Sequence, residues 1–167
     1  MNLKTRKYVL FGVLTAISIA LDQWTKVLAR AKLRHHEAHV VIKKFFTLSY
    51  SENRGVAFGI LGGLPPFVLT LVAVVAFGLV VHYLYKSEDR HTRMHVALGL
   101  VGGGAIGNLI DRVLYQRVTD FIVFDLGFPP FHPWPAFNIA DAVLVIGVAL
   151  MGVDMLLAPK PAKVKDR

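Results

Sequence analysis

The chain has 167 residues, of which 54% are hydrophobic and 18% charged. This composition is too apolar for an ordinary soluble domain and is typical of a protein embedded in a membrane. The net charge of +8 does not indicate a nucleic-acid-binding protein, because the basic residues cluster at the termini and in short connectors. The absence of cysteine excludes disulfides and thiolate chemistry.

The first predicted element is a transmembrane helix over residues 8–28, which follows three basic residues. A run of about 20 apolar residues is enough to cross a bilayer. The basic start and the sequence Ala-Arg-Ala at 29–31 also fit a cleavable signal peptide. We favour the transmembrane helix, because the apolar run is longer than in signal peptides and Asp22 and Lys26 interrupt its end.

The outer loop over residues 29–65 is predicted to contain a small β element. Apolar and polar residues alternate strictly over residues 46–51, which is the period of a half-buried strand. The preceding residues 40–42 are a short β-branched run that can pair with this strand. We therefore expect a small sheet that lies on the membrane surface.

Three further transmembrane helices are predicted over residues 66–85, 94–114 and 137–157. The chain shows no internal repeat and no low-complexity segment. We therefore expect residues 1–167 to form a single membrane domain. Its fold class is all-α, with the small β element as the exception.

The distribution of lysine and arginine predicts the orientation of these helices. The N-terminus, the connector at 86–93 and the C-terminal tail together hold ten basic residues, far more densely than the loops at 29–65 and 115–136. Because basic segments are retained on the inner side, both termini are expected to be cytoplasmic and both long loops to be outside.

Polar side chains gather at one depth, near the outer ends of the predicted helices. Inserting such groups into a membrane costs free energy, so those that occur there usually carry function or bridge helices. Asp22 and Lys26 lie one helical turn apart and are interpreted as a structural pair. Asp111 and its neighbour Arg112 are interpreted as an anchor at the membrane interface or as a support for the site. The same layer contains Asn108, Arg112, Asp120, Asn138 and Asp141.

Asp120 and Asp141 are the candidates for chemistry in this layer. Asp141 has no cation one turn away in its helix, and Asp120 has only Arg117, in an expected exposed turn. Two carboxylates held close together cannot both ionise, so such a pair shares one proton. The ionised member can take a proton from an attacking water while the other donates to an amide carbonyl oxygen. On spacing alone, a pathway for protons or cations is an alternative.

Other catalytic chemistries find little support in the sequence. It contains neither the Gly-x-Ser-x-Gly elbow of hydrolases nor the Gly-x-Gly-Asp signature of presenilin-like proteases. The sequence His-His-Glu-Ala-His at 35–39 differs from the zinc-binding His-Glu-x-x-His pattern and lies in a basic loop. We interpret it as a solvated loop, and we expect no metal and no other cofactor.

Five motifs follow one another along the chain. They are Asp-Gln-Trp-Thr-Lys at 22–26, Asn-Arg-Gly-Val-Ala-Phe at 53–58, Gly-Gly-Ala-Ile-Gly-Asn-Leu-Ile-Asp-Arg at 103–112, Val-Thr-Asp-Phe at 118–121 and Phe-Asn-Ile-Ala-Asp at 137–141. In this order they resemble the motifs of the lipoprotein signal peptidase (type II signal peptidase) family. Val56 and Ala142 depart from the usual residues of that family, at positions not expected to carry chemistry, and the stretch 126–134 is expected to alter the outer rim.

The resemblance implies an aspartyl endopeptidase of the bacterial inner membrane. Members of the family remove signal peptides from diacylglyceryl-modified prolipoproteins, cut on the amino side of the lipidated cysteine, and are targets of the inhibitor globomycin. The family's catalytic aspartates fall on Asp120 and Asp141. Its substrate-binding and supporting residues fall on Asn53, Gly55, Asn108, Arg112 and Asn138, and its structural polar residues on Asp22, Lys26 and Asp111.

The expected partners are the lipid-modified prolipoprotein and membrane lipid, and not nucleic acid. A lipid-modified substrate cannot leave the bilayer, so the active site is expected near the outer face of the membrane. The surface sheet and residues 55–63 are expected to close over the substrate. The alternative function is a small proton-coupled transporter, but that class typically shows repeat symmetry and polar groups near the bilayer midplane.

Overall fold

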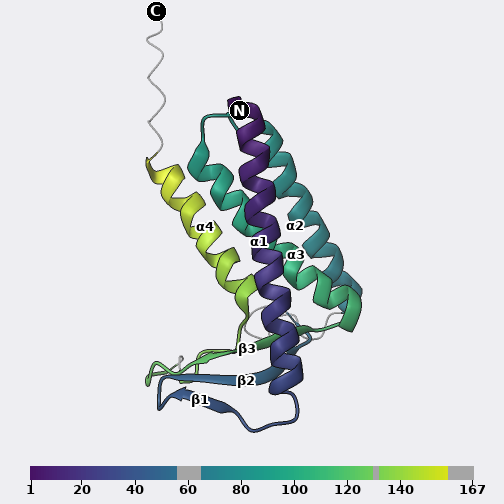
Figure 1. Cartoon of the computed structure of the whole chain (residues 1–167), viewed down its shortest axis with the longest axis vertical. Coiled ribbons are helices and arrows are strands. Elements are labelled where there is room, and N and C mark those ends of the chain that lie inside the picture. The colour runs from purple at the N-terminus through teal and green to yellow at the C-terminus, as the bar shows by residue number, and fades with distance from the viewer. Residues whose placement is uncertain (56–64, 130–131, 158–167) are drawn as a thin grey trace, which may run out of the picture.

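The computed structural model describes residues 1–55, 65–129 and 132–157. Four helices stand side by side and a sheet lies at one end of the bundle, opposite the N-terminus (Figure 1). All four helices are long and apolar enough to cross a membrane. They are α1 (Leu3–Lys32), α2 (Pro66–Lys86), α3 (Thr92–Tyr115) and α4 (Ile139–Leu157), and the strands are β1 (His39–Ile42), β2 (Phe46–Asn53) and β3 (Val118–Phe124).

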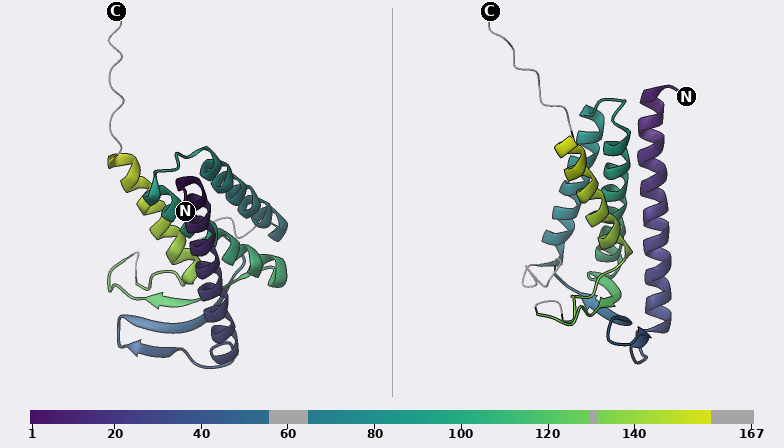
Figure 2. Two further views of the ribbon diagram at one scale, coloured as in Figure 1. Left: turned by 45° about the horizontal axis from the view of Figure 1, so that its top comes forward. Right: turned by 90° about the vertical axis from the view of Figure 1, so that its left-hand side faces the viewer.

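The helices confirm the four predicted spans but differ from them at their ends. α1 extends beyond the predicted 8–28 on both sides, and the Asn2 side chain caps its start by accepting the N–H of Thr5 at 2.7 Å. Its 30 residues reach about 45 Å, so it extends to the sheet (Figures 1 and 2). α1 continues unbroken through residues 29–31. α4 begins two residues later than predicted, at Ile139.

α3 is the central helix and packs against α1, α2 and α4. Its glycines permit the close approach that this position requires. A Cβ atom on Gly103 would lie 2.4 Å from the Cβ of Ser18 on α1, and one on Gly104 would lie 2.4 Å from the backbone oxygen of Ala140 on α4. The glycine run therefore brings α1 and α4 against α3 at the end of the bundle that faces the sheet.

The sheet is antiparallel, with the strand order β1-β2-β3. The hairpin of β1 and β2 confirms the predicted pairing, with His39 opposite Leu48. The prediction that Asp120 lies in a short loop was wrong, because residues 118–124 form a third strand that pairs with β2. Residues 118–121 are all buried, so the alternation of polar and apolar residues that marks a half-exposed strand is missing. Figure 1 shows β3 nearest the helices.

A tight turn joins α3 to β3. Gln116 ends the helix in the left-handed conformation, with φ of 57°, and its N–H donates to the carbonyl of Arg112 at 3.0 Å. The strand begins two residues later, at Val118. Asp120 therefore lies close to the polar end of α3.

Candidate active site

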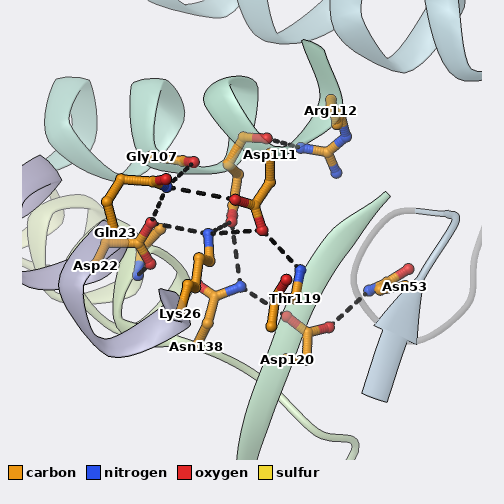
Figure 3. A network of polar contacts seen from close by, with 12 residues as sticks. Asp22, Gln23, Lys26, Asn53, Gly107, Asp111, Arg112, Thr119, Asp120 and Asn138 are labelled. Carbon is orange, nitrogen blue, oxygen red and sulfur yellow. Dashed lines mark hydrogen bonds and ion pairs between the residues drawn. The ribbon is translucent and has the colours of Figure 1, made fainter. Parts of the chain in front are cut away.

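Polar side chains converge where the helix bundle meets the sheet (Figure 3). Asp120 lies on β3, opposite Ser51 of β2, and only 2% of it is exposed. Asp141 lies in the first turn of α4. The predicted supporting residues surround them: Asn53 ends β2, Gly55 follows it, Asn108 and Arg112 lie on α3, and Asn138 directly precedes α4.

Asn138 and Asp141 begin α4 as a reciprocal capping pair. The Asn138 Oδ1 accepts the N–H of Asp141 at 3.0 Å, and the Asp141 Oδ2 accepts the backbone N–H of Asn138 at 3.3 Å. The carbonyl of Asn138 accepts the N–H of Ala142 at 3.2 Å, which makes Asn138 the cap residue. Our prediction that Asn138 lies within the helix was therefore wrong by one position. The cap fixes the Asp141 carboxylate relative to Asn138.

Two asparagines bind the carboxylate of Asp120, one at each oxygen. The Asn53 Oδ1 accepts the N–H of Gly55 at 2.9 Å, so its NH2 group donates to the Asp120 Oδ2 at 3.1 Å. The Asn138 Oδ1 accepts the backbone N–H of Asp141, so its NH2 group donates to the Asp120 Oδ1 at 2.6 Å. Because a backbone N–H only donates, the orientation of each amide is determined.

A third asparagine binds the carboxylate of Asp141. The Asn108 Oδ1 accepts the Nζ of Lys26 at 2.8 Å and the NH2 group of Asn138 at 3.1 Å. Its own NH2 group therefore faces the Asp141 Oδ1 and donates to it at 2.8 Å. The two aspartates are thus linked through Asn138 and each is held by oriented amide donors.

The pKa of Asp120 is raised to about 7, first because the carboxyl group is buried and second because the charge of Asp141 lies nearby. The hydrogen bonds from Asn53 and Asn138 oppose this shift but do not cancel it. Near neutral pH the Asp120 carboxyl is therefore protonated in a large fraction of molecules. Interacting carboxyl groups of this kind titrate together and share a proton.

A second polar network lies against the first and is completely buried. The Lys26 Nζ lies 2.8 Å from the Asp22 Oδ2 and 3.8 Å from the Asp111 Oδ2, and all three side chains are 0% exposed. The Asp111 Oδ2 accepts the backbone N–H of Thr119 at 2.9 Å. The Asp22 Oδ1 accepts the backbone N–H of Ala140 at 2.9 Å. Each buried carboxylate thus holds the residue that immediately precedes one of the two candidate aspartates.

A cavity of about 540 Å³ opens beside Asp141. Asn53, Asn108 and Asp141 contribute its polar wall, and most of the remaining wall is apolar. Val145 and Ile146 of α4 also line it, and they are 65% and 52% exposed on the surface that an apolar transmembrane helix presents to lipid. The cavity therefore joins the Asp141 carboxyl group to the lipid-facing side of α4.

The sequence from residue 14 to residue 157 matches the model of the family described as signal peptidase (SPase) II. The chain belongs to this family. It is 39% identical over 156 residues to a lipoprotein signal peptidase of Syntrophus aciditrophicus, covering 91% of this chain and 95% of the relative. It is 43% identical over 148 residues to one of Pelodictyon phaeoclathratiforme, covering 85% and 87%. These relatives confirm the resemblance that the five motifs indicated.

Solved structures agree with this assignment. A bacterial membrane enzyme determined by the in meso method at 2.3 Å superposes with a TM-score of 0.81 at 30% identity, covering 94% of this chain and 93% of that one. A second, determined at 1.9 Å, gives a TM-score of 0.78 at 30% identity, covering 89% of this chain and 94% of that one. As a member of the signal peptidase II family, the chain is a peptidase with transmembrane helices, and hence a hydrolase.

Arg112 and Gly55 extend the candidate site toward β2. The Arg112 Nη2 donates to the carbonyl of Gly55 at 3.3 Å, and Arg112 also lines the cavity. Gly55 is buried. The expected closure over the substrate by residues 55–63 falls almost wholly on 56–64, which lie outside the described residues.

Three members of the buried network were not predicted as site residues. Gln23 donates to the carbonyl of Gly107 at 3.0 Å, and the Arg30 Nη1 donates to the Thr119 Oγ1 at 2.9 Å. Arg30 follows Lys26 by one helical turn, so the spacing of 22, 26 and 30 would have indicated it if the first helix had been predicted to its true end. Thr119 carries no comparable signal, because its role depends on the strand that was missed.

Among the residues that the structure describes, no group of three or more His, Asp and Glu side chains is arranged to hold a metal ion. The histidines at 35 and 36 are exposed in the turn after α1, as the interpretation as a solvated loop predicted, and His39 begins β1. Every buried side-chain nitrogen and oxygen atom in the described part of the chain has a hydrogen-bond partner. The two networks are therefore preorganised, and what they offer chemically is a linked pair of carboxyl groups, of which Asp141 lines a lipid-accessible cavity.

Proposed function

We propose that this protein removes signal peptides from diacylglyceryl-modified prolipoproteins by aspartyl hydrolysis, with Asp120 and Asp141 as its catalytic pair. The cut lies on the amino side of the lipidated cysteine. The relatives named above are lipoprotein signal peptidases, which supports this substrate class. The transporter alternative receives no comparable support, because the linked polar groups gather where the helices meet β3 (Figure 3).

The observation that carries this proposal is the position of Asp141 on a cavity that reaches the lipid-facing side of α4, with the Asp120 carboxyl group linked to it through Asn138. A lipid-modified substrate keeps its acyl chains in the bilayer, so its scissile bond must be reached from there. Val145 and Ile146 offer an apolar surface to the acyl chains, while Asp141 lies one to two turns away on the same helix. One cavity can thus hold the lipid and present the peptide bond to the carboxyl groups.

The expected protonation states of the two carboxyl groups give each aspartate a different role. Asp120, whose pKa is about 7, carries the shared proton and donates it to the carbonyl oxygen of the scissile amide. Asp141 lies at the start of α4, where the helix dipole favours a negative charge, and it takes a proton from the attacking water. The water oxygen bonds to the carbonyl carbon. The proton held by Asp141 then passes to the leaving nitrogen as the carbon–nitrogen bond breaks. One hydroxyl group of the intermediate returns its proton to Asp120, which leaves a carboxylic acid and restores the singly protonated pair.

In this proposal the protein spans the bacterial inner membrane with both termini in the cytoplasm, and the site faces the outer side. The density of lysine and arginine at the termini and in the 86–93 connector supports this orientation. Because the chain has no cysteine, a single cysteine can be introduced at His36 or at Arg90 as a unique reporter. A membrane-impermeant thiol reagent applied to intact cells should label the first and not the second; the reverse pattern would refute the orientation.

The function is tested by incubating the purified full-length protein in detergent with a diacylglyceryl-modified prolipoprotein and following the loss of the signal peptide on a gel. The wild type should cleave, and globomycin should inhibit it. Asp120→Asn and Asp141→Asn should each lower the rate by about a hundredfold to ten-thousandfold, as expected for the loss of a general acid or base. Asp89→Asn, which alters an exposed carboxylate at the opposite end of the bundle, is the control and should cleave normally.

Mass spectrometry of the product should place the cut on the amino side of the lipidated cysteine. If the wild type fails to cleave, or if either folded Asp→Asn variant retains near-normal activity, the assignment of the catalytic pair is wrong. Proton-dependent uptake of a solute by vesicles containing the protein would then favour the transporter.

A further inference from the structure

Among the residues the structure describes, Lys26 is the only positively charged residue that hydrogen-bonds to a side-chain amide of the group Asn53, Asn108 and Asn138 around the two aspartates. It lies on α1, is 0% exposed, and donates to the Asn108 Oδ1 at 2.8 Å. Asn108 lines the cavity and donates to the Asp141 Oδ1 at 2.8 Å. The lysine is therefore one amide removed from the carboxylate, and it has no exposed surface with which to contact a substrate.

The side-chain amide of Asn108 can connect the Lys26 ammonium group to the Asp141 carboxylate in only one orientation. An ammonium group has donors and no acceptor, so the atom that Asn108 turns toward Lys26 must be its oxygen. The NH2 group then has to face Asp141. A hydrogen bond that involves a charged group is shorter and stronger than a neutral one, and it polarises the next bond in the chain.

We propose that Lys26 is a positioning residue of the aspartyl pair. Its ammonium group holds the Asn108 amide as a donor to Asp141 and transmits part of its positive charge there, so that Asp141 is the member of the pair that ionises and Asp120 the member that keeps the proton. This inference rests on the proposed function and adds to it the means by which the protein distinguishes two chemically identical groups. It also gives Lys26 a task beyond the structural pairing with Asp22.

Other charges face the same region, and the inference must hold with all of them present. Asp22 and Asp111 contact Lys26, and Arg30 lies 3.3 Å from Asp111, so these four charges balance. Removal of the lysine alone leaves one negative charge in excess beside the pair. The charged groups that surround the site are Asp22, Lys26 and Arg30 from α1, Asp111 and Arg112 from α3, Asp120 from β3 and Asp141 from α4.

The competing interpretation is that Lys26 only holds α1 against α3. The chain offers a matched control for it, because Lys7 is a second buried lysine of the same helix, 3% exposed. Its Nζ donates to the carbonyl of Ser87 at 2.8 Å and lies 3.1 Å from Asp89, at the opposite end of the bundle. Lys7→Met therefore removes a buried lysine and its ion pair without altering the amides of the site.

The test compares wild type, Lys26→Met and Lys7→Met as full-length proteins in detergent, with the diacylglyceryl-modified prolipoprotein as the probe and kcat measured from pH 4 to 9. In Lys26→Met the acidic limb of the kcat profile should move to higher pH by about one unit, because the ionised member loses a charge-assisted donor. KM should change little, since Lys26 does not reach the cavity. Lys7→Met should keep the wild-type profile.

An unchanged limb in Lys26→Met, or an equal displacement in Lys7→Met, would overturn the inference while the proposed function stands. A wild type that does not cleave would instead overturn the proposed function itself. If Lys26→Met fails to fold because two carboxylates lose their partner, Asp22→Asn/Lys26→Met restores the balance of charge and is compared with Asp22→Asn. The acidic limb of the kcat profile should lie at higher pH in the double variant than in Asp22→Asn. Identical profiles of these two variants would overturn the inference.

Discussion

The carboxylate of Asp22 on α1 accepts the backbone N–H of Ala140 on α4, at 2.9 Å. The two residues are 118 positions apart in the chain, and Ala140 immediately precedes Asp141. Asp111 makes the equivalent bond to the N–H of Thr119, which immediately precedes Asp120. Two buried carboxylates that face away from the cavity thus determine where the two candidate catalytic carboxylates lie.

Replacement of Asp22 by alanine should destabilise the protein strongly. The change removes the acceptor for the N–H of Ala140 and leaves Lys26 buried with only Asp111 at 3.8 Å as a charged partner. The loss of one member of a buried ion pair typically costs about 3 to 5 kcal/mol. We expect a lower thermal unfolding temperature in detergent and a large loss of peptidase activity. Asp89→Ala, which removes a 42% exposed partner of a buried lysine, should have a much smaller effect; equal effects would contradict the role given to Asp22.

A second prediction concerns the packing of α4 on α3. A Cβ on Gly104 would lie 2.4 Å from the oxygen of Ala140 and 2.9 Å from the Cβ of Leu144, and backbone cannot move aside as a flexible side chain can. Gly104→Ala should therefore cost about 1 to 3 kcal/mol of stability and displace the start of α4, with a fall in kcat. Gly152→Ala on α4 is the control, because a Cβ there meets nothing within 4 Å. Differential scanning calorimetry of both variants would compare their unfolding temperatures. A Gly104→Ala variant as stable as the wild type would contradict this packing.

The sequence predicts the helices and the layer of polar residues well, because both depend on local composition. Runs of apolar residues mark spans, and charged or amide residues such as Asp22 and Asn108 are conspicuous within them. The position of Asn138 and Asp141 at the start of a helix also follows from sequence, although a capping residue was taken for a helical one. Element ends are set by one or two hydrogen bonds, which composition does not record.

The remainder of the site depends on contacts between distant segments. β3 was not predicted, because its buried residues 118–121 lack the alternation of polar and apolar residues that identifies a half-buried strand. The bonds from Thr119 and Ala140 use backbone N–H groups, which every residue except proline possesses, so no residue type indicates them. The division of the polar layer into a buried support and a linked carboxyl pair, of which Asp141 lines the cavity, is therefore a property of the fold.

A third prediction tests the lipid-facing wall of the cavity. Val145 and Val148 are both exposed on α4, at 65% and 52%, but Val145 lines the cavity and Val148 lies one turn further along the helix. Val145→Phe should fill part of the space assigned to the acyl chains and raise KM for the diacylglyceryl substrate several-fold while kcat changes little. Val148→Phe should leave both constants near their wild-type values. Equal effects of the two substitutions, measured by initial rates in detergent, would argue against acyl chains in this cavity.

The last prediction follows from the protonation of Asp120. In the proposed mechanism the active form of the pair holds one proton, and Asp120 donates it to the scissile carbonyl. Because the pKa of Asp120 is raised to about 7, a rise in pH through that value removes the donor. The wild-type kcat/KM should therefore fall by about tenfold per pH unit well above neutrality, as expected when a single group must remain protonated.

The measurement is a series of initial rates between pH 5 and 9.5, with thermal unfolding recorded in the same buffers to separate titration from loss of structure. Asn53→Ala removes the amide donor to the Asp120 Oδ2, a bond that lowers the pKa of this carboxyl group. Its basic limb should consequently lie at higher pH than that of the wild type, even if its maximal rate is reduced. A wild-type profile that is flat up to pH 9, or a basic limb that moves to lower pH in Asn53→Ala, would mean that Asp120 is not the proton donor.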